Sequence, residues 1–176
     1  VQPNSSVYDA AKLISPSLAR DALIGEIDGK AVDLTAKIDK DCKLNILTFD
    51  DKSGKDAFWH TSSHVMAQAV KRLFPDVKFA IGPAIDAGFY YDFDVPAPFV
   101  PEDLDKIAGE MKKIIKENHQ PKRIELSREE ALKFFKDKGE IYKVELVEAI
   151  AEGEKISMYE QGEFVDLCAG PHLYDL

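Results

Sequence analysis

The sequence predicts an α+β protein in two parts, a small unit at residues 1–50 and a larger unit at residues 57–176. Three observations support this division. Segments with helical periodicity are interspersed with short segments in which apolar and polar residues alternate, a pattern typical of strands. A strong hairpin signal, Asp28-Gly29, lies in the first part. The charged segment DDKSGKD separates the parts and predicts a linker at residues 51–56.

The first unit reads as a small mixed sheet with one main helix. Asn4–Ser6 supply candidate N-caps for an amphipathic helix that runs through Ile14, and a second helical piece follows at Leu18–Leu23. Two short strands flank Asp28-Gly29, and Lys43–Phe49 alternates as a further strand. This order is that of a β-grasp fold that lacks its opening hairpin.

The second unit reads as helices packed on an antiparallel sheet. Two of its predicted helices have clear start signals: Pro101 with three acidic residues opens one, and the capping box Ser127–Glu130 opens another. The segment at 142–150 is ambiguous between strand and helix, and we favour a helix. The predicted order is helix 57–73, strand 77–82, strand 88–95, helix 101–118, strand 122–127, helix 128–138, helix 142–150 and hairpin 155–170.

Composition narrows the class of protein. The chain has 176 residues, of which 45% are hydrophobic and 31% charged, as in an ordinary globular protein. It has no apolar run of membrane-spanning length and no signal pattern, and its two cysteines give no disulfide framework, so we expect a cytoplasmic location. A net charge of −9 argues against free-standing nucleic-acid binding. The chain begins without Met and stops soon after His172, so we expect it to be a piece of a longer protein.

Two short motifs concentrate the residues that carry chemistry. HTSSH places His60 and His64 one helical turn apart, on one face of the predicted helix, and CAGPH supplies Cys168 and His172. The chain has only four histidines and two cysteines, and four of these six residues lie in the two motifs. Such groups bind Zn²⁺, and they also serve as acid–base groups in hydrolytic pockets. The simpler alternative is a pair of satisfied core histidines beside a buried thiol.

With these motifs in place, the chain resembles the N-terminal region of threonyl-tRNA synthetases. The first unit is similar to their TGS domain, through ISPSLA, IDGKAVDL and LTFDD. The larger unit resembles their editing domain, which alanyl-tRNA synthetases share, through HTSSH, AIGPAIDAGFYYDFD, YKVEL and FVDLCAGPH. The resemblance implies that the start of the TGS domain and the tail of the editing domain are missing. It also implies that a catalytic core, which uses ATP and its own zinc, lies downstream.

The resemblance implies an activity, the hydrolysis of serine mistakenly esterified to threonine tRNA. Serine lacks one methyl group of threonine, and one methyl group discriminates by only about 1–3 kcal/mol in a binding pocket. A second, hydrolytic pocket therefore adds selectivity. Water attack on the ester needs a general base, an oxyanion stabiliser and groups that hold the substrate. The implied partner is the acceptor end of tRNA(Thr) carrying serine, and the full-length enzyme would be a homodimer through the absent domains.

The resemblance also assigns roles to residues. The residues matching catalytic positions are His60, Lys143 and His172. The residues matching the substrate-binding wall are His64, Tyr91, Asp166 and Cys168. Asp166 lies two residues before Cys168, so in a strand both side chains point to the same face. Three other residues are expected outside the site: Tyr90 in the core, His119 at a helix end or in solvent, and Cys42 as an inert thiol.

Two alternative functions remain open. One is a zinc-dependent deacylase of the alanyl type, in which His60, His64, Cys168 and His172 bind Zn²⁺. The other is a non-catalytic module that docks tRNA or regulates a larger protein. Because a lysine is implied at the same site, we expect that editing needs no cofactor and that zinc, if the cluster binds it, is not obligatory.

Overall fold

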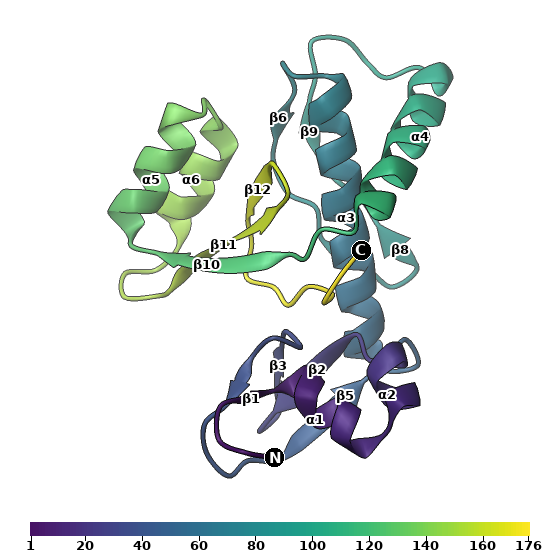
Figure 1. Ribbon diagram of the computed structural model, residues 1–176. Helices are drawn as coiled ribbons and strands as arrows, with labels where there is room; N and C mark the ends of the chain where they lie inside the picture. The colour runs from purple at the N-terminus through teal and green to yellow at the C-terminus, as the bar shows by residue number, and fades with distance from the viewer.

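Two groups of helices and strands are joined by one long helix, α3 (Lys52–Leu73), in the computed structural model, which describes residues 1–176 (Figure 1). The smaller group comes first in the chain and the larger group contains everything after α3. Six helices and several antiparallel sheets give the α+β architecture that the sequence predicts. No helix combines the length and apolar character that crossing a membrane requires.

The first unit packs a helix on a three-stranded antiparallel sheet of order β3-β2-β5. A separate short ladder pairs β1 with β4. The core lies between α1 and the sheet, where Val7 and Ala11 are fully buried. The elements are β1 (Ser5–Ser6), α1 (Val7–Ile14), α2 (Pro16–Asp21), β2 (Ile24–Ile27), β3 (Lys30–Val32), β4 (Lys37–Ile38) and β5 (Leu44–Leu47).

Local chemistry explains where these elements begin and turn. Ser6 caps α1, because its hydroxyl accepts the Asp9 N–H while the Asp9 carboxylate accepts the Ser6 N–H. Asp28 and Gly29 have φ of +50° and +83°, the positive values that a two-residue hairpin of type I′ requires. The β1–β4 ladder was not predicted, because strands of two residues carry no readable alternation.

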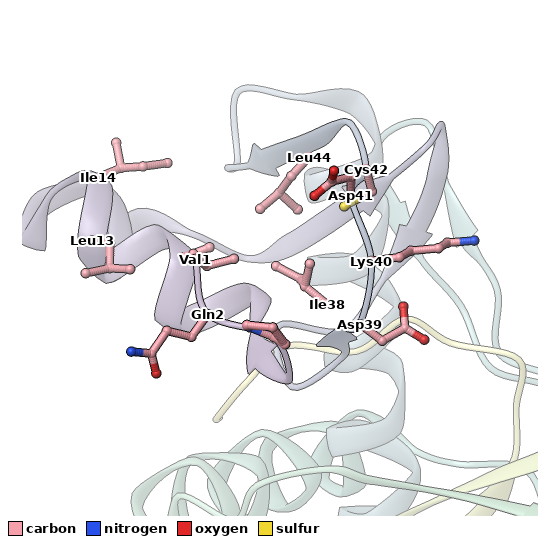
Figure 2. A pocket seen from close by; sticks show the side chains of 12 residues that line it. Val1, Gln2, Leu13, Ile14, Ile38, Asp39, Lys40, Asp41, Cys42 and Leu44 are labelled. Carbon is pink, nitrogen blue, oxygen red and sulfur yellow. The ribbon is translucent and has the colours of Figure 1, made fainter.

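A groove of about 700 Å³, lined by apolar and charged residues, lies along α1 (Figure 2). Figure 2 shows Val1, Ile38 and Leu44 at this groove together with Leu13 and Ile14 of the helix. The side chains of Leu13 and Ile14 are largely exposed. This face of the first unit therefore has no partner within the structure.

The second unit is organised around α3. Helix α4 packs along α3, and α5 and α6 form a helical hairpin beside the antiparallel sheet β10-β11-β12 (Figure 1). Two smaller ladders, β6-β9 and β7-β8, lie against α3 and α6. The elements are β6 (Lys78–Phe79), β7 (Ala84–Ile85), β8 (Gly88–Phe89), β9 (Phe93–Asp94), α4 (Pro101–Glu117), β10 (Lys122–Leu126), α5 (Arg128–Asp137), α6 (Ile141–Ala149), β11 (Ile156–Gln161) and β12 (Phe164–Leu167).

Three details differ from the sequence prediction. Helix α3 begins at Lys52 rather than residue 57, so most of the expected linker is its first turn, where Lys52 and Asp56 form an ion pair of 2.8 Å. The expected strand at 88–95 is divided into β8 and β9, which pair with different partners. The expectation that Tyr90 lies in the core was wrong, since its side chain is 42% exposed between those two strands.

The first turn of α3 lies so close to β5 that only glycine fits at position 54. A Cβ atom there would be 2.0 Å from the carbonyl oxygen of Thr48. We predict that Gly54→Ala lowers the free energy of unfolding by about 1–3 kcal/mol, because backbone must move to accept the methyl group. Gly109→Ala is the matched control, since no atom lies within 4 Å of a Cβ there and alanine favours the helix by about 1 kcal/mol. Urea denaturation of both variants checks this, and a Gly54→Ala protein as stable as the parent would refute the close contact.

Candidate functional site

The two predicted motifs meet in the structure. His60 and His64 lie on one face of α3, with ring centroids 4.9 Å apart. Cys168 and His172 follow β12 and lie against that face, so the centroids of His172 and His64 are 4.3 Å apart. Cys168 Sγ is 2.9 Å from His60 Nε2 and 3.3 Å from His172 Nε2. All four ligand atoms lie within 4.8 Å of one another, which makes this group a candidate metal-binding cluster.

A second buried cluster adjoins the first and contains Lys143, Asp166 and Tyr91. The Lys143 ammonium is 2.5 Å from Asp166 Oδ1, and the Tyr91 hydroxyl donates to Asp166 Oδ2 at 2.6 Å. Lys143 also donates to the Tyr91 oxygen at 3.1 Å and to the carbonyl oxygen of Ala80 at 2.7 Å. Asp166 connects the two clusters, because its Oδ2 is 3.8 Å from His64 Nε2.

Separate elements supply these groups. Lys143 lies in the first turn of α6, a helix that contacts β6. Asp166 lies in β12 and shares with Cys168 the inward side, while Leu167 between them faces the other way and packs against the α5–α6 core. The alternation of a strand therefore brings both polar side chains to α3, as the sequence spacing predicts.

Burial sets the charge state of the imidazoles. Loss of hydration lowers the pKa of His64 and of His172 well below the usual value for histidine, and the neighbouring rings lower it further. Burial also lowers the pKa of His60, and the positive charge of Lys143 lowers it too, against an opposing effect of Asp166. At neutral pH the cluster therefore holds three neutral imidazoles.

The thiol and the phenol are likewise uncharged. Burial raises the pKa of Cys168 to about 12, so its sulfur carries a proton when no cation is bound. Burial, reinforced by the Asp166 carboxylate, raises the pKa of Tyr91 far above its ordinary value. The only formal charges at the centre of the site are those of Lys143 and Asp166, which form one ion pair.

A cavity of about 220 Å³ opens beside His60. Its wall combines Ala57 and Ala84 of the second unit with Ile24 and Ala31 of the first, together with Ser53, Asp56, Gly170 and Pro171. His60 is the partly exposed member of the cluster, whereas Cys168 and the other two histidines are buried. A small molecule could therefore reach the cluster at His60.

The structure brings all seven predicted site residues into these two adjoining clusters. His119 lies at the surface beside Glu117, and Cys42 packs against the core of the first unit, so neither joins the site. Tyr90 is exposed and stays outside the cluster to which Tyr91 belongs.

Three contacting residues were not predicted from sequence. Thr61 places its Oγ1 3.1 Å from His172 Nδ1, and its position inside HTSSH was the available signal. Tyr159 lies against the His172 ring, with centroids 4.4 Å apart. Asp33, from the first unit, accepts a hydrogen bond from the His172 backbone N–H at 2.8 Å. No local pattern marks Tyr159 or Asp33, because both contacts depend on tertiary packing.

Comparison with known proteins agrees with this architecture. Residues 1–48 match the TGS domain family. The chain is 63% identical over 168 residues, 96% of its length, to the threonine–tRNA ligase of Caldanaerobacter subterraneus subsp. tengcongensis. It is 59% identical over 168 residues, also 96% of its length, to the threonine–tRNA ligase of Acetivibrio thermocellus, and 58% identical over 170 residues, 97% of its length, to that of Carboxydothermus hydrogenoformans. Nearly the whole chain is therefore similar to the N-terminal regions of these threonine–tRNA ligases.

The resemblance inferred from the motifs is therefore confirmed, both for the TGS domain and for the threonine–tRNA ligase relatives. The alignments cover 26% of the ligases from Caldanaerobacter and Acetivibrio and 27% of the ligase from Carboxydothermus. The chain thus spans about a quarter of the length of the curated relatives it matches.

The neutral histidines predict a loss of stability in acid. In the unfolded chain a histidine has a pKa of about 6.5, and the folded site lowers the pKa of His64 and of His172. The unfolded state therefore binds more protons as the pH falls below about 6.5, so stability decreases. At pH 5.5 each residue should cost about 1.4 kcal/mol of unfolding free energy relative to pH 7.5.

Urea denaturation at both pH values, with a chelator present, measures this loss. His119→Gln should keep the full decline, because His119 lies at the surface. An unfolding free energy that is the same at both pH values would show that the buried imidazoles can be protonated in the folded protein.

Proposed function

We propose that this region hydrolyses serine from mischarged seryl-tRNA(Thr), as the proofreading part of a threonine–tRNA ligase. The observation that carries the proposal is the convergence of HTSSH and CAGPH beside a buried lysine–carboxylate pair. Neutral imidazoles accept protons, and a fixed ammonium stabilises developing negative charge, which are the two requirements of ester hydrolysis. The relatives' names support the ligase context.

His60 is the proposed general base. It is neutral at pH 7 and lies at the wall of the 220 Å³ cavity, where an ester and a water molecule can approach. In the proposed step the water oxygen bonds to the ester carbonyl carbon while His60 takes the water proton. The ester C–O bond then breaks, and the ribose oxygen leaves with the proton that His60 took from the water.

Lys143 is proposed to act as a charged group rather than as a second base. Its three ammonium hydrogens already have acceptors in Asp166, Tyr91 and Ala80. A substrate oxygen that replaced one of these acceptors would gain a charge-assisted hydrogen bond as negative charge develops on it. This role agrees with the assignment of Lys143 to catalysis or water placement.

The remaining residues are proposed to hold the substrate and the proton-transfer geometry. Asp166 offers a carboxylate for the α-ammonium of serine, and Tyr91 and His64 are its neighbours. His172, the second proposed acid–base group, contacts Cys168 Sγ through Nε2. Crowding by Cys168 and the rings around it would oppose the extra methyl group of threonine, which supplies selectivity beyond the roughly 1–3 kcal/mol of a single pocket.

The proposed partner is the acceptor end of tRNA(Thr) carrying serine. With a net charge of −9, this chain should bind tRNA weakly by itself. The rest of the full-length ligase would supply most of the affinity, together with ATP use, a zinc site of its own and dimer formation.

The cluster also fits zinc by its donor set. Imidazole nitrogens and a thiolate are the ligands of tetrahedral zinc sites, and the four ligand atoms already lie within 4.8 Å of one another. His60, His64, Cys168 and His172 would then hold the ion, which would act as a Lewis acid or lower the pKa of bound water. However, four protein ligands close a tetrahedral shell, whereas catalytic zinc keeps one position open. This observation favours hydrolysis without metal.

We predict that His60→Asn and Lys143→Met each slow deacylation of seryl-tRNA(Thr) by about 10²–10⁴-fold, because each removes a proton-transfer or charge-stabilising group. Release of labelled serine, measured in the full-length ligase or at high concentration of this chain, gives the rates. Threonyl-tRNA should be spared by the parent protein. The matched controls are His119→Asn and Lys112→Met, which change surface residues.

Unchanged serine release in both site variants would contradict the catalytic assignment. A parent protein that binds tRNA and releases no serine would instead favour the non-catalytic docking module.

A separate prediction concerns metal. Deacylation should survive treatment with a chelator that removes all zinc from this chain, because the proposed chemistry uses only its side chains. Elemental analysis of the treated protein checks removal. Activity that disappears with the metal and returns with added Zn²⁺, in parallel with loss of activity in Cys168→Ala, would favour the alanyl-type alternative.

A further inference from the structure

Asp33 is a half-buried carboxylate of the first unit that bonds to the second unit and forms no close ion pair. It follows β3, and both of its oxygens are used by the second unit. Oδ1 accepts the backbone N–H of His172 at 2.8 Å, and Oδ2 accepts the hydroxyl of Tyr159 at 2.8 Å. Partial burial raises the pKa of Asp33, while these two hydrogen bonds and the positive charge of Arg123 oppose the rise. Removing a carboxylate even partly from water is costly unless its oxygens are hydrogen-bonded, and both oxygens of Asp33 are bonded to groups of the second unit.

The segment that Asp33 contacts has no regular secondary structure. After β12 the chain from Cys168 to Leu173 forms neither helix nor strand, and it lies between the two units (Figure 1). Its position is fixed by three bonds to acceptors outside the segment: Cys168 N–H to the carbonyl oxygen of Ser157, His172 N–H to Asp33, and Leu173 N–H to Thr61 Oγ1. Asp33 supplies the bond at the histidine itself.

Through Tyr159, Asp33 also restrains the imidazole ring of His172. The ring centroid of Tyr159 is 4.4 Å from that of His172, and its hydroxyl is held by Asp33. The hydroxyl also lies so close to Gly170 that a Cβ there would be 2.0 Å away. One carboxylate therefore fixes the backbone of His172 directly and the surface beneath its ring through Tyr159.

We propose that Asp33 is a positioning residue through which the first unit orients His172 in the site of the second unit. The proposal rests on the deacylation function proposed above, because it assigns Asp33 an effect on that reaction. Asp33 does not touch the reacting atoms and acts through His172. The first unit is then part of the hydrolytic site as well as a neighbouring domain.

The test is the steady-state deacylation of seryl-tRNA(Thr) by Asp33→Ala and Asp33→Asn. Asparagine keeps an oxygen acceptor for the His172 N–H and a polar partner for the Tyr159 hydroxyl, whereas alanine removes both. Misplacing a reacting group by about 1 Å costs on the order of 10²-fold. We expect Asp33→Ala to lower kcat by about 10- to 100-fold with KM changed by less than about twofold, and Asp33→Asn to restore kcat to within about threefold.

The control separates positioning from loss of stability. Asp9 caps α1 in the same unit through Ser6 and does not contact the site. Asp9→Ala should therefore destabilise the first unit, yet leave kcat unchanged at temperatures where the protein is folded. Equal loss of kcat in Asp9→Ala and Asp33→Ala would overturn the proposal, as would a folded Asp33→Ala protein with the parent kcat.

A second readout does not depend on activity. NMR can follow hydrogen exchange of the His172 backbone amide. Exchange should be at least about tenfold faster in Asp33→Ala than in the parent protein, because loss of the acceptor lets the segment open and exposes the N–H. Asp33→Asn and Asp9→Ala should exchange at the parent rate. If the parent releases no serine, the proposed function fails, and this measurement alone decides the positioning: an amide still protected in Asp33→Ala overturns it. If Asp33→Ala does not fold, Asp33→Glu replaces it in both readouts, since its longer side chain displaces the two oxygens.

Discussion

The site depends on the buried ion pair between Lys143 and Asp166. Each side chain is about 4% exposed, and the pair joins α6 to β12 across the interior of the second unit. Removing one partner of such a pair leaves an uncompensated buried charge and typically costs about 3–5 kcal/mol. The same charges hold the hydroxyl of Tyr91 and the carbonyl oxygen of Ala80, so the pair fixes four segments of chain at once. Keeping this ion pair buried therefore requires that all four segments stay in fixed positions.

Helix α3 provides the second constraint, because the face it buries is partly polar. Thr61, Ser63, His64 and Gln68 are all buried on the helix, beside apolar residues such as Val65. Three of these four residues make hydrogen bonds. The hydroxyl of Thr61 contacts His172, that of Ser63 donates to the carbonyl oxygens of His60 and Gly82, and Gln68 bonds to Gln161 and Glu163. Polar residues on the buried face are tolerated only when they are satisfied in this way, and their partners come from the site and the strands around it.

The elements that could be read from the sequence are those that local chemistry determines. The Asp28-Gly29 hairpin, the Ser127–Glu130 capping box and the HTSSH spacing each fix geometry within a few residues, and each appears as expected. The start of α3 was misplaced because a charged, glycine-containing segment resembles a linker even when it forms an exposed helical turn. The contact of Asp33 with His172 joins residues far apart in the chain, so only the folded structure reveals it. The residues that lie together in the two clusters could therefore be named from the sequence, whereas the contacts that support them could not.

The distribution of charge constrains how a substrate could enter. The imidazoles, thiol and phenol are neutral at pH 7, so Asp166 is the acceptor with a full negative charge at the centre of the site. The α-ammonium of an aminoacyl ester would be drawn to that carboxylate, where it would compete with Lys143. If the ion pair weakened, one ammonium hydrogen of Lys143 would lack an acceptor. The carbonyl oxygen of the same ester could then accept that hydrogen bond as the oxygen gains negative charge. Under the proposed function, substrate binding and activation are then linked: the ammonium that anchors serine is also the group that frees Lys143 for catalysis.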